Sequence, residues 1–443
     1  MTEYTQKRAA IKKQWPSAGG QVRLAKATVS NLFRYQPTSG SAQRVSLGQF
    51  NEVIAIDSAA QTLDVEGLAT FETIVANTLP RGYLPPVTPE LKHITIGGAT
   101  VGIGIESTGF RHGFVHDALR EAEVLLPGGD IVTCTAENEH ADLFHALPNS
   151  YGTLGYILRA RLALLPARPF VHLRIECFDT PRGYLDAMEQ ATTRPNIDFV
   201  EGLFFEDRRF FLMTGRFTDE VPQVDDILRD HVFYELVQAR RDIYLATADY
   251  IFRYDPEWFW NIPNTPLYDL FRRHAPRRFR NSGFYTRYAA WKNRLREHMP
   301  ARPPLMTEPL IQDWEVPWEK AGELVEFCLR EVELDGRPWA AVPICTPRQP
   351  MLYPLAANQL YFNLGCYCHV PKAVGREPYH YSKIMDRKCF ELGGIKMLYS
   401  STFLDPAEFD ARFNGAAYRV LKAKYDPRGK APSLYEKVTV NTV

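Results

Sequence analysis

The hydrophobic and polar positions change period several times in the first part of the chain. Residues 53–67 and 118–136 each hold two alternating apolar–polar runs around a turn-forming stretch, which predicts two β-hairpins. Residues 127–130, with two consecutive glycines, form the predicted turn of the second hairpin. Residues 68–83 carry apolar side chains at helical spacing and predict an amphipathic helix. Residues 142–166 predict a short helix, a glycine-bearing turn and a long strand.

The pattern changes after about residue 169 and predicts a second α+β unit. The strand-like runs of this part are residues 172–178, 199–206, 209–217, 361–367 and 396–403. The helical stretches are predicted near residues 181–192, 222–240 and 407–424. The whole chain is therefore expected to have an α+β fold, and no internal repeat suggests a solenoid or a propeller.

Composition narrows the class of protein. The 443 residues are 45% hydrophobic and 23% charged, which is ordinary for a globular chain and excludes a disordered, collagenous or disulfide-scaffold protein. With 52 basic and 52 acidic residues, the chain lacks the basic excess of a general nucleic-acid binder. Its seven cysteines are odd in number and widely scattered, which indicates free thiols in a reducing compartment.

The amino-terminal residues predict a short basic helix that ends at Pro16. They contain no apolar core of a secretory signal, and no stretch of the chain approaches the ~20 apolar residues of a spanning helix. We therefore expect a cytoplasmic protein, at most attached to the inner face of a membrane.

The most informative segment is glycine-rich and covers residues 88–114. A strand is expected to end at Gly97-Gly98, and four further glycines follow it. Free amides in such a loop can bind phosphate oxygens, although a purely structural glycine loop is an equal alternative. The spacing lacks the third glycine of a Rossmann fingerprint and the GK[ST] of a Walker loop. A nucleotide bound here therefore implies another fold.

Several stretches together resemble a known flavoprotein family. They are TIGGATVGIGIES (95–107), FRHG (110–113), EVLLPGGDIVTCT (123–135), DLFHALPNSYGTLGYILRARLALLPA (142–167) and FVEGLFFE (199–206). The family is the FAD-binding PCMH-type, or vanillyl-alcohol oxidase/p-cresol methylhydroxylase, superfamily. Within it the chain is most similar to the sterol Δ24-reductase branch and its bacterial methylene-fatty-acyl reductase relatives, and the likeness extends from the first helix to the carboxy-terminal helix.

The resemblance implies a division into two domains. Residues 1–168 would form the FAD-binding domain from two α+β subdomains. Residues 169–443 would form an α+β substrate or cap domain, with the carboxy-terminal helices folding back. The FAD is expected to be non-covalent, because the loop offers Ile105 and Glu106 where a covalent link would need His, Tyr or Cys.

The family's cofactor-binding segments match defined positions of this chain. They are Thr95, Gly97, Gly98, Thr100, Gly102, Ile103, Gly104, Ser107, Gly152, Gly155 and Ile157. Residues 27–30 would take the place of a phosphate loop but depart from its usual form. His93 and His112 lie near the loop, and a structural role is the prediction for both.

The sterol-reductase branch saturates an isolated carbon–carbon double bond, for which a reduced flavin delivers hydride and the protein supplies a proton. Our catalytic candidates are Glu106, Tyr254 and Tyr361. Arg253, Tyr367, and Tyr399 are further possible acids, whereas the plainer interpretation of each tyrosine is a core aromatic residue. No metal is predicted, because the Cys-Tyr-Cys-His run at 366–369 lacks a second ligand pair at zinc spacing.

A basic segment lies outside these motifs. Its cations are Arg272, Arg273, Arg277, Arg278, Arg280, Arg287, Lys292, Arg294 and Arg296. Three interpretations stay open: a solvated helical face, a surface for anionic phospholipid, or recognition of the NADPH phosphate. Of these, the phospholipid surface is slightly favoured.

The predicted activity is NAD(P)H-dependent reduction of an isolated lipid alkene by FAD, with NADPH as the expected electron donor. The short amino terminus and the basic segment favour a methylene-branched fatty acyl chain of a phospholipid as substrate. The alternatives are a sterol side chain, or oxidation of an alcohol or sugar as elsewhere in the superfamily. A lipid-binding module without catalysis is a further alternative.

Overall fold

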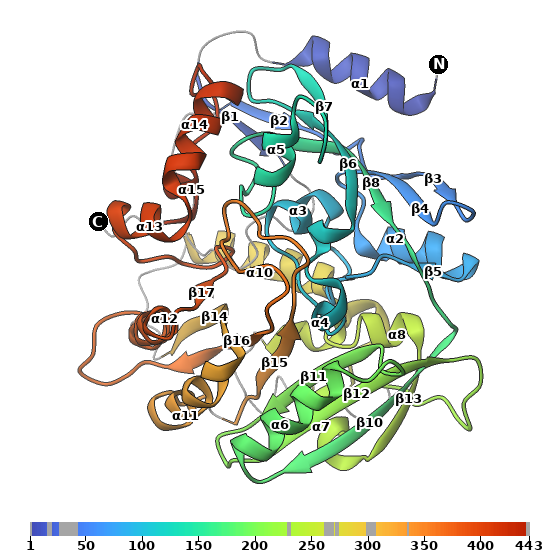
Figure 1. The fold of residues 1–443 in the computed structure, drawn as a ribbon, viewed down its shortest axis with the longest axis vertical. Helices are drawn as coiled ribbons and strands as arrows, with labels where there is room; N and C mark the ends of the chain where they lie inside the picture. Colours follow the sequence, from blue (N-terminus) through green and yellow to red (C-terminus); the bar gives the residue numbers. More distant parts are fainter. Residues whose placement is uncertain are drawn as a thin grey trace.

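The computed structural model describes residues 2–15, 20–25, 43–227, 232–260, 270, 274–297, 307–334 and 336–439. Two antiparallel sheets, of five and eight strands, organise this part of the chain (Figure 1). Two short pairs accompany them, β1 (Val22–Ala25) with β2 (Gln43–Ser46) and β5 (Tyr83–Leu84) with β9 (Leu165–Pro166). Helices mix with strands throughout, so the predicted α+β class is confirmed.

The five-stranded sheet contains both predicted hairpins and the long strand after them. Its order is β3 (Val53–Asp57), β4 (Thr62–Glu66), β8 (Tyr156–Ala163), β6 (Leu119–Leu125) and β7 (Ile131–Thr135). Because side chains alternate between the faces of a strand, one row across the sheet can be wholly apolar. That row is Val65, Ala160, Ala122 and Cys134, and each of these residues is fully buried.

Short helices connect these strands. They are α2 (Phe71–Thr78), α3 (Ile96–Val101), α4 (Gly109–His112) and α5 (Ala141–Ala146), whereas α1 (Glu3–Gln14) precedes all the strands. The helix expected over residues 68–83 is shorter, because it begins after the capping residue Thr70 and passes into a 3-10 turn at Leu79–Arg81. The prediction that a strand ends at Gly97-Gly98 is wrong. A helix starts there instead, since Thr95 caps it by accepting the Gly98 amide at 3.3 Å.

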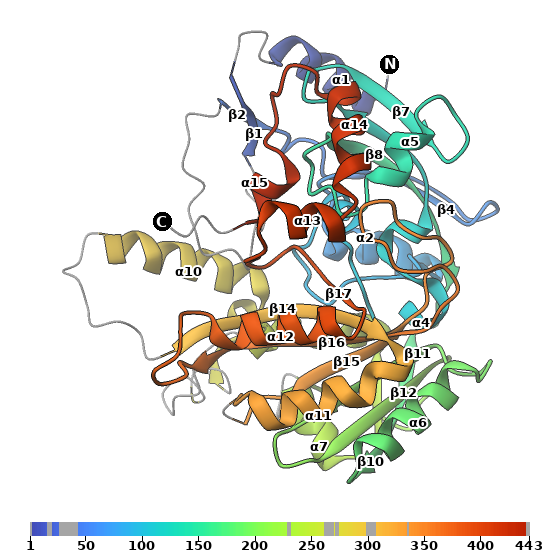
Figure 2. The same cartoon turned by 60° about the vertical axis from the view of Figure 1, so that its left-hand side comes forward.

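The eight-stranded sheet contains the strands after residue 169. Its order is β13 (Asp242–Ala246), β10 (Phe170–Phe178), β12 (Phe210–Thr218), β11 (Phe199–Phe204), β15 (Trp339–Ile344), β16 (Tyr361–Pro371), β14 (Thr307–Pro317) and β17 (Ile395–Lys396). Helices α6 (Pro181–Thr192), α11 (Ala321–Glu331) and α12 (His380–Glu391) cover one face (Figure 2). Trp314 on β14 points to this face and donates to the Asp386 carboxylate of α12 at 2.8 Å.

The other face of this sheet meets the glycine-rich segment. The Val200 amide donates to the Ser107 carbonyl at 2.9 Å, and the Cys345 amide donates to the Gly109 carbonyl at 3.0 Å. Beside it lie α7 (Phe233–Ala239), α8 (Thr247–Ile251), the 3-10 turn η3 (Asp255–Trp260) and α10 (Ser282–Glu297). The helix expected near 222–240 is therefore confined to α7 within the described residues.

The carboxy-terminal predictions need two corrections. Residues 396–403 are not a continuous strand, because β17 ends at Lys396 and the chain then turns so that Tyr399 reaches Asp313. The single helix expected near 407–424 is two helices, α13 (Pro406–Arg412) and α14 (Gly415–Tyr425), separated at Asn414 with a φ of 51°. A last short helix, α15 (Leu434–Val438), follows.

The carboxy-terminal helices return to the first sheet's side of the molecule. Tyr425 of α14 donates to Asp142 at the start of α5 at 2.6 Å, and the hydroxyls of Tyr418 and Thr153 lie 2.9 Å apart. The domain division at residue 168 stays a prediction. Among the described residues, none of the helices combines the length and the apolar character needed to cross a bilayer.

Candidate active site

The two stretches that match the family's cofactor-binding segments lie side by side. The Tyr151 amide donates to the Val101 carbonyl at 3.1 Å, and the Tyr151 hydroxyl donates to the Gly102 carbonyl at 3.2 Å. Gly67, which follows β4, contacts both of these stretches. A Cβ on Gly67 would stand 1.9 Å from the Ile157 carbonyl oxygen, and the Gly67 carbonyl accepts the Gly97 amide at 2.8 Å. This close approach is one that only glycine permits.

The backbone is strained where these segments meet. Ile103, a β-branched residue, has a φ of 58°, and Asn149 and Tyr151 have φ values of 63° and 49°. Such conformations are costly for non-glycine residues and cluster at ligand sites. Asn149 is fully buried, yet within the described chain its Oδ1 atom has no hydrogen-bond partner. Strained loops beside an unsatisfied polar atom fit a phosphate-bearing cofactor such as FAD.

The remaining positions that match these segments surround the same junction. Thr100 donates to the Ile96 carbonyl at 2.8 Å, and Gly104 packs so closely on Val115 that a Cβ would come within 2.7 Å of it. Ser107 shares a hydrogen bond of 3.0 Å with the Tyr250 hydroxyl, at the boundary with the eight-stranded sheet. Gly152 and Gly155 both have positive φ. Residues 27–30, the expected phosphate loop, lie outside the described residues.

The two histidines near the loop have protein partners or a buried setting. His93 Nδ1 lies 3.2 Å from the Ser282 hydroxyl, and burial lowers the pKa of His112 to about 4. These surroundings agree with the structural role predicted for both. Whether the flavin is held covalently stays a prediction.

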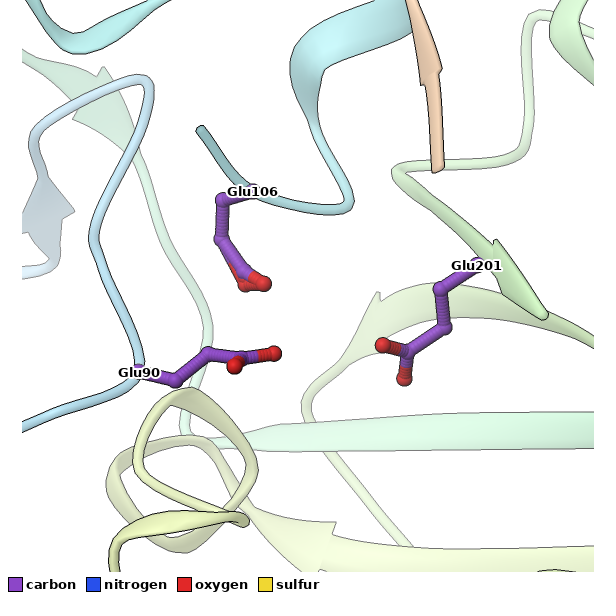
Figure 3. A group of neighbouring side chains, drawn as sticks. All are labelled: Glu90, Glu106 and Glu201. Atoms are coloured by element: carbon purple, nitrogen blue, oxygen red, sulfur yellow. The ribbon is translucent and has the colours of Figure 1, made fainter. Parts of the chain in front are cut away.

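Glu106, the first catalytic candidate, belongs to a buried group that we call the arginine–glutamate cluster: Glu90, Glu106, Glu201 and Arg253. The three carboxyl groups converge from separate elements (Figure 3). Arg253, fully buried, bridges them with nitrogen–oxygen distances of 2.8 Å to Glu90, 3.0 Å to Glu106 and 2.9 Å to Glu201. The guanidinium therefore lies where a metal ion would bind the three carboxylates.

One cation cannot neutralise three carboxylates. Burial and the neighbouring Glu106 raise the pKa of Glu90, and burial raises the pKa of Glu201 despite its contact with Arg253. Arg253 also lies 4.4 Å from the centre of the Tyr250 ring. The cluster joins the glycine-rich segment to β11 and holds a charged pair at their junction.

Of the other two catalytic candidates, Tyr254 lies beside the cluster that contains Glu106, and Tyr361 does not. Tyr254 is buried with its ring 5.0 Å from the Arg253 guanidinium, so it packs against the cluster. Tyr361 begins β16, where its hydroxyl accepts from the Ala356 amide at 3.1 Å and donates to the Gln359 side chain at 3.3 Å. Tyr361 therefore holds a loop together, and its catalytic role stays an untested prediction.

A second buried group was only partly visible in the sequence. We call it the carboxyl–tyrosine cluster: Asp313, Glu315, Tyr353, Asn363, Tyr367 and Tyr399. The Tyr367 hydroxyl lies 2.8 Å from both Asp313 oxygens, and the Tyr399 hydroxyl donates to Asp313 at 2.5 Å. Glu315 accepts from the Asn363 amide at 2.8 Å and from the Tyr353 hydroxyl.

Burial without a cationic partner raises the pKa of both carboxyl groups. The pKa of Asp313 rises to about 6, and the pKa of Glu315 rises to about 8 with a further contribution from the Asp313 charge. The phenol donors act against this rise but do not cancel it. Glu315 is therefore protonated at neutral pH and stores a proton inside the protein.

Strand register places the two clusters on the same sheet face. Gly202 of β11 pairs with Ala341, and Asn363 of β16 pairs with both Val342 and Glu315. Glu201 precedes Gly202, so it is in register with Val342 and shares a row with Glu315 across β15 and β16. The sequence signal for this cluster is the alternation of Asp313 and Glu315 around Trp314, which sequence analysis did not single out.

The cysteines are all free thiols, as expected. Cys366 and Cys368 point to the same face of β16 with their sulfur atoms 3.5 Å apart. The two residues are buried, and desolvation raises the pKa of the Cys366 thiol well above its usual value. This setting favours neutral, unreactive thiols.

Comparisons with known proteins agree with this geometry. The family model of the FAD binding domain matches residues 24–135. The Delta(24)-sterol reductase of Macaca fascicularis is 26% identical over 406 residues, which cover 87% of this chain and 76% of the relative. The Delta(24)-sterol reductase homolog dhcr-24 of Caenorhabditis elegans is 24% identical over 463 residues, covering 96% and 85%.

A shorter match reaches the wider superfamily. Cytokinin dehydrogenase 9 of Oryza sativa subsp. japonica is 30% identical over 155 residues, or 35% of this chain and 30% of the relative. The likeness to the sterol reductases is thus the longer one, and it includes both sheets. The resemblance inferred from the motifs is confirmed: this chain is an FAD-dependent oxidoreductase homologous over most of its length to the Delta(24)-sterol reductases.

Proposed function

We propose that this flavoprotein reduces an isolated carbon–carbon double bond of a lipid, with NADPH as the electron donor. The observation that carries the proposal is the length of the match to the Delta(24)-sterol reductases, which covers 87% of the chain and so extends well beyond the FAD binding domain. FAD bound at the glycine-rich segment would supply hydride to one carbon of the alkene.

The nature of the lipid is the finer part of the proposal. The names of the relatives favour a sterol side chain over the methylene-branched fatty acyl chain predicted from the sequence. Both substrates present an unactivated alkene on a long apolar body, and reduction of either needs a proton donor as well as hydride. The acyl substrate is kept as the alternative outcome of the test.

A basic cavity supports NADPH in preference to NADH. A cavity of about 370 Å³ between α2 and α8 is lined by Lys92, Arg277, Arg278 and Arg280. Glu72 and Asp249 also line it, so the excess of positive charge is modest. A 2′-phosphate is the group that such arginines recognise. Arg278→Ala is expected to raise KM for NADPH and leave KM for NADH unchanged, as measured by steady-state flavin turnover.

The outer face of α10 supports contact with a membrane surface. Tyr288, Trp291 and Leu295 are spaced along one helical face and are 42%, 58% and 44% exposed. Arg277 and Arg278 are exposed nearby. Aromatic and basic residues together suit an anionic bilayer interface. We expect Trp291→Ala to reduce sedimentation with phosphatidylglycerol vesicles, whereas Val374→Ala, at a 94% exposed residue elsewhere, leaves sedimentation unchanged.

Anaerobic absorbance of the flavin tests the activity itself. The oxidised flavin spectrum is expected to bleach with NADPH and to recover when a lipid alkene is added. Recovery with desmosterol supports the sterol substrate, and recovery with a methylene-branched phospholipid supports the acyl substrate. Bleaching by an alcohol or sugar, with no response to NADPH or NADH, would show an oxidase or dehydrogenase instead.

A further inference from the structure

The carboxyl–tyrosine cluster lies against the cofactor-binding segments. The Tyr353 ring meets the Phe114 ring edge-on at 6.1 Å between centroids, and the next residue, Val115, donates its amide to the Gly104 carbonyl at 2.9 Å. The Asn149 side-chain amide donates to the Leu352 carbonyl at 2.7 Å. One side of the cluster is therefore anchored to the glycine-rich segment.

Apart from each other, the cluster's two acids contact only neutral groups within the described part of the chain. Tyr353 comes from the loop before β16, Tyr367 from β16 and Tyr399 from the turn after β17. The Cys389 thiol of α12 lies behind the strand and donates to the Glu315 backbone carbonyl at 3.7 Å. The ion pair of Lys396 with Asp386, at 2.6 Å, lies on the opposite face of the sheet with Trp314.

Two tyrosine side chains of the cluster are more exposed than its acids. Asp313 and Glu315 are 2% and 0% exposed, whereas Tyr367 and Tyr399 are only partly buried. Burial raises the pKa of the Tyr367 phenol well above its usual value, and the charges of Asp313 and Glu90 add to the rise. Tyr367 contacts both Asp313 oxygens, so it is a phenol through which a proton can leave the carboxyl pair.

The protonation state of Asp313 decides what the Tyr367 hydroxyl can do. When Asp313 is ionised, the Tyr367 proton is held between its two oxygens. When Asp313 is protonated, its own O–H can donate to the Tyr367 oxygen, and the phenol proton no longer has to point at Asp313. Burial raises the pKa of Asp313 to about 6, so Asp313 takes up this proton as the pH falls toward 6.

We propose that Tyr367 is the proton donor to the substrate alkene and that Asp313 supplies the replacement proton, an inference that rests on the proposed function. The Tyr367 O–H bond breaks as a C–H bond forms at one alkene carbon, and the Asp313 proton moves to the phenol oxygen. The other carbon takes hydride, two electrons that originate in NADPH. Asp313 is left as a carboxylate, which Tyr399 stabilises by donation until solvent returns a proton.

The arginine–glutamate cluster is a weaker candidate for this role. Glu106 is ion-paired with a fully buried guanidinium at 3.0 Å, so its carboxyl group is already engaged by a cation. The carboxyl–tyrosine cluster has the opposite character, because no cation of the described chain contacts its carboxyl groups. It is therefore the better source of a proton.

The test separates the two halves of the reaction. In Tyr367→Phe and Asp313→Asn, bleaching of the flavin by NADPH is expected to keep the wild-type rate, while reoxidation by the lipid alkene slows by about 10²–10⁴-fold. Tyr425→Phe is the matched control, since Tyr425 makes a similar phenol–carboxylate bond to Asp142 at 2.6 Å on α14, away from both clusters. Its reoxidation rate is expected to be unchanged.

An infrared readout on the FAD-free protein does not depend on turnover. The carbonyl stretch of a protonated carboxyl group is expected near neutral pH and should weaken in Glu315→Gln. If the lipid alkene reoxidises the flavin of Tyr367→Phe at the same rate as that of the wild type, the assignment of Tyr367 as proton donor is overturned and the proposed function is not. A wild-type flavin that no lipid alkene reoxidises would overturn the proposed function and the donor together, and the infrared band would then report only the stored proton.

Discussion

Two buried acidic clusters share one face of the eight-stranded sheet and differ in one respect, the presence of a cation. The arginine–glutamate cluster surrounds Arg253, whose guanidinium lies within about 3 Å of three carboxyl groups. The carboxyl–tyrosine cluster surrounds its acids with phenols and an amide. The first is suited to join two parts of the molecule through charge. The second is suited to hold and release a proton, because burial without a cation favours the neutral acid.

The largest expected effect comes from removing the cation. Arg253→Met leaves three buried carboxyl groups without a counter-charge, and breaking a buried ion pair in this way costs about 3–5 kcal/mol. We expect a fall of that size in the free energy of unfolding, measured by urea denaturation at pH 7. Arg253→Lys should recover part of it. A loss below 1 kcal/mol would show that the glutamates are already neutral and that the two clusters are alike.

The pH dependence of the free energy of unfolding tests the same comparison on the carboxyl–tyrosine cluster. Glu315 has a pKa of about 8 in the folded chain, above the ordinary value of 4.5, so it contributes stability at low pH that is lost as the pH rises through 8. From pH 5 to pH 8 the loss is roughly 3 kcal/mol. Urea midpoints of the wild type should fall over this range, and those of Glu315→Gln should fall less.

Glu90 and Glu201 complicate this measurement, because their pKa values are also raised and their contributions have the same sign. Only the difference between wild type and Glu315→Gln isolates one group. Glu308→Gln provides the control on the same strand, since its carboxylate accepts a backbone amide from Tyr379 at 2.7 Å and an amide oxygen can do the same. If the urea midpoints of the wild type and of Glu315→Gln change with pH in parallel, the raised pKa assigned to Glu315 is contradicted.

The smallest effect concerns the second phenol. Tyr399→Phe removes one donor to Asp313, and a hydrogen bond to a charged group contributes about 1.5–3 kcal/mol. The pKa of Asp313 should therefore rise, and the alkene reoxidation rate should persist to higher pH than in the wild type. A stopped-flow pH profile of reoxidation tests this shift, and a profile that moves to lower pH would contradict it.

Local patterns determined much of the fold from the sequence. The two hairpins, the long strand after them and helix α6 (Pro181–Thr192) follow directly from periodicity and turn residues. The glycine-rich segment also identified the flavoprotein family. Two predictions failed because a single residue changed the local backbone. Thr95 caps a helix where a strand was expected, and Asn414, in a left-handed conformation, divides the last predicted helix in two.

The chemistry of the site depends on contacts that no local pattern contains. Glu106 looked like an acid beside the glycines, and only the fold brings Arg253 to it from 147 residues away. Asp313 and Tyr399 are separated by 86 residues and meet because β17 ends at Lys396. Sequence periodicity reports which side of a strand a residue occupies. It does not report which charged or neutral group faces that residue across the sheet, and that partner sets the pKa of a buried acid.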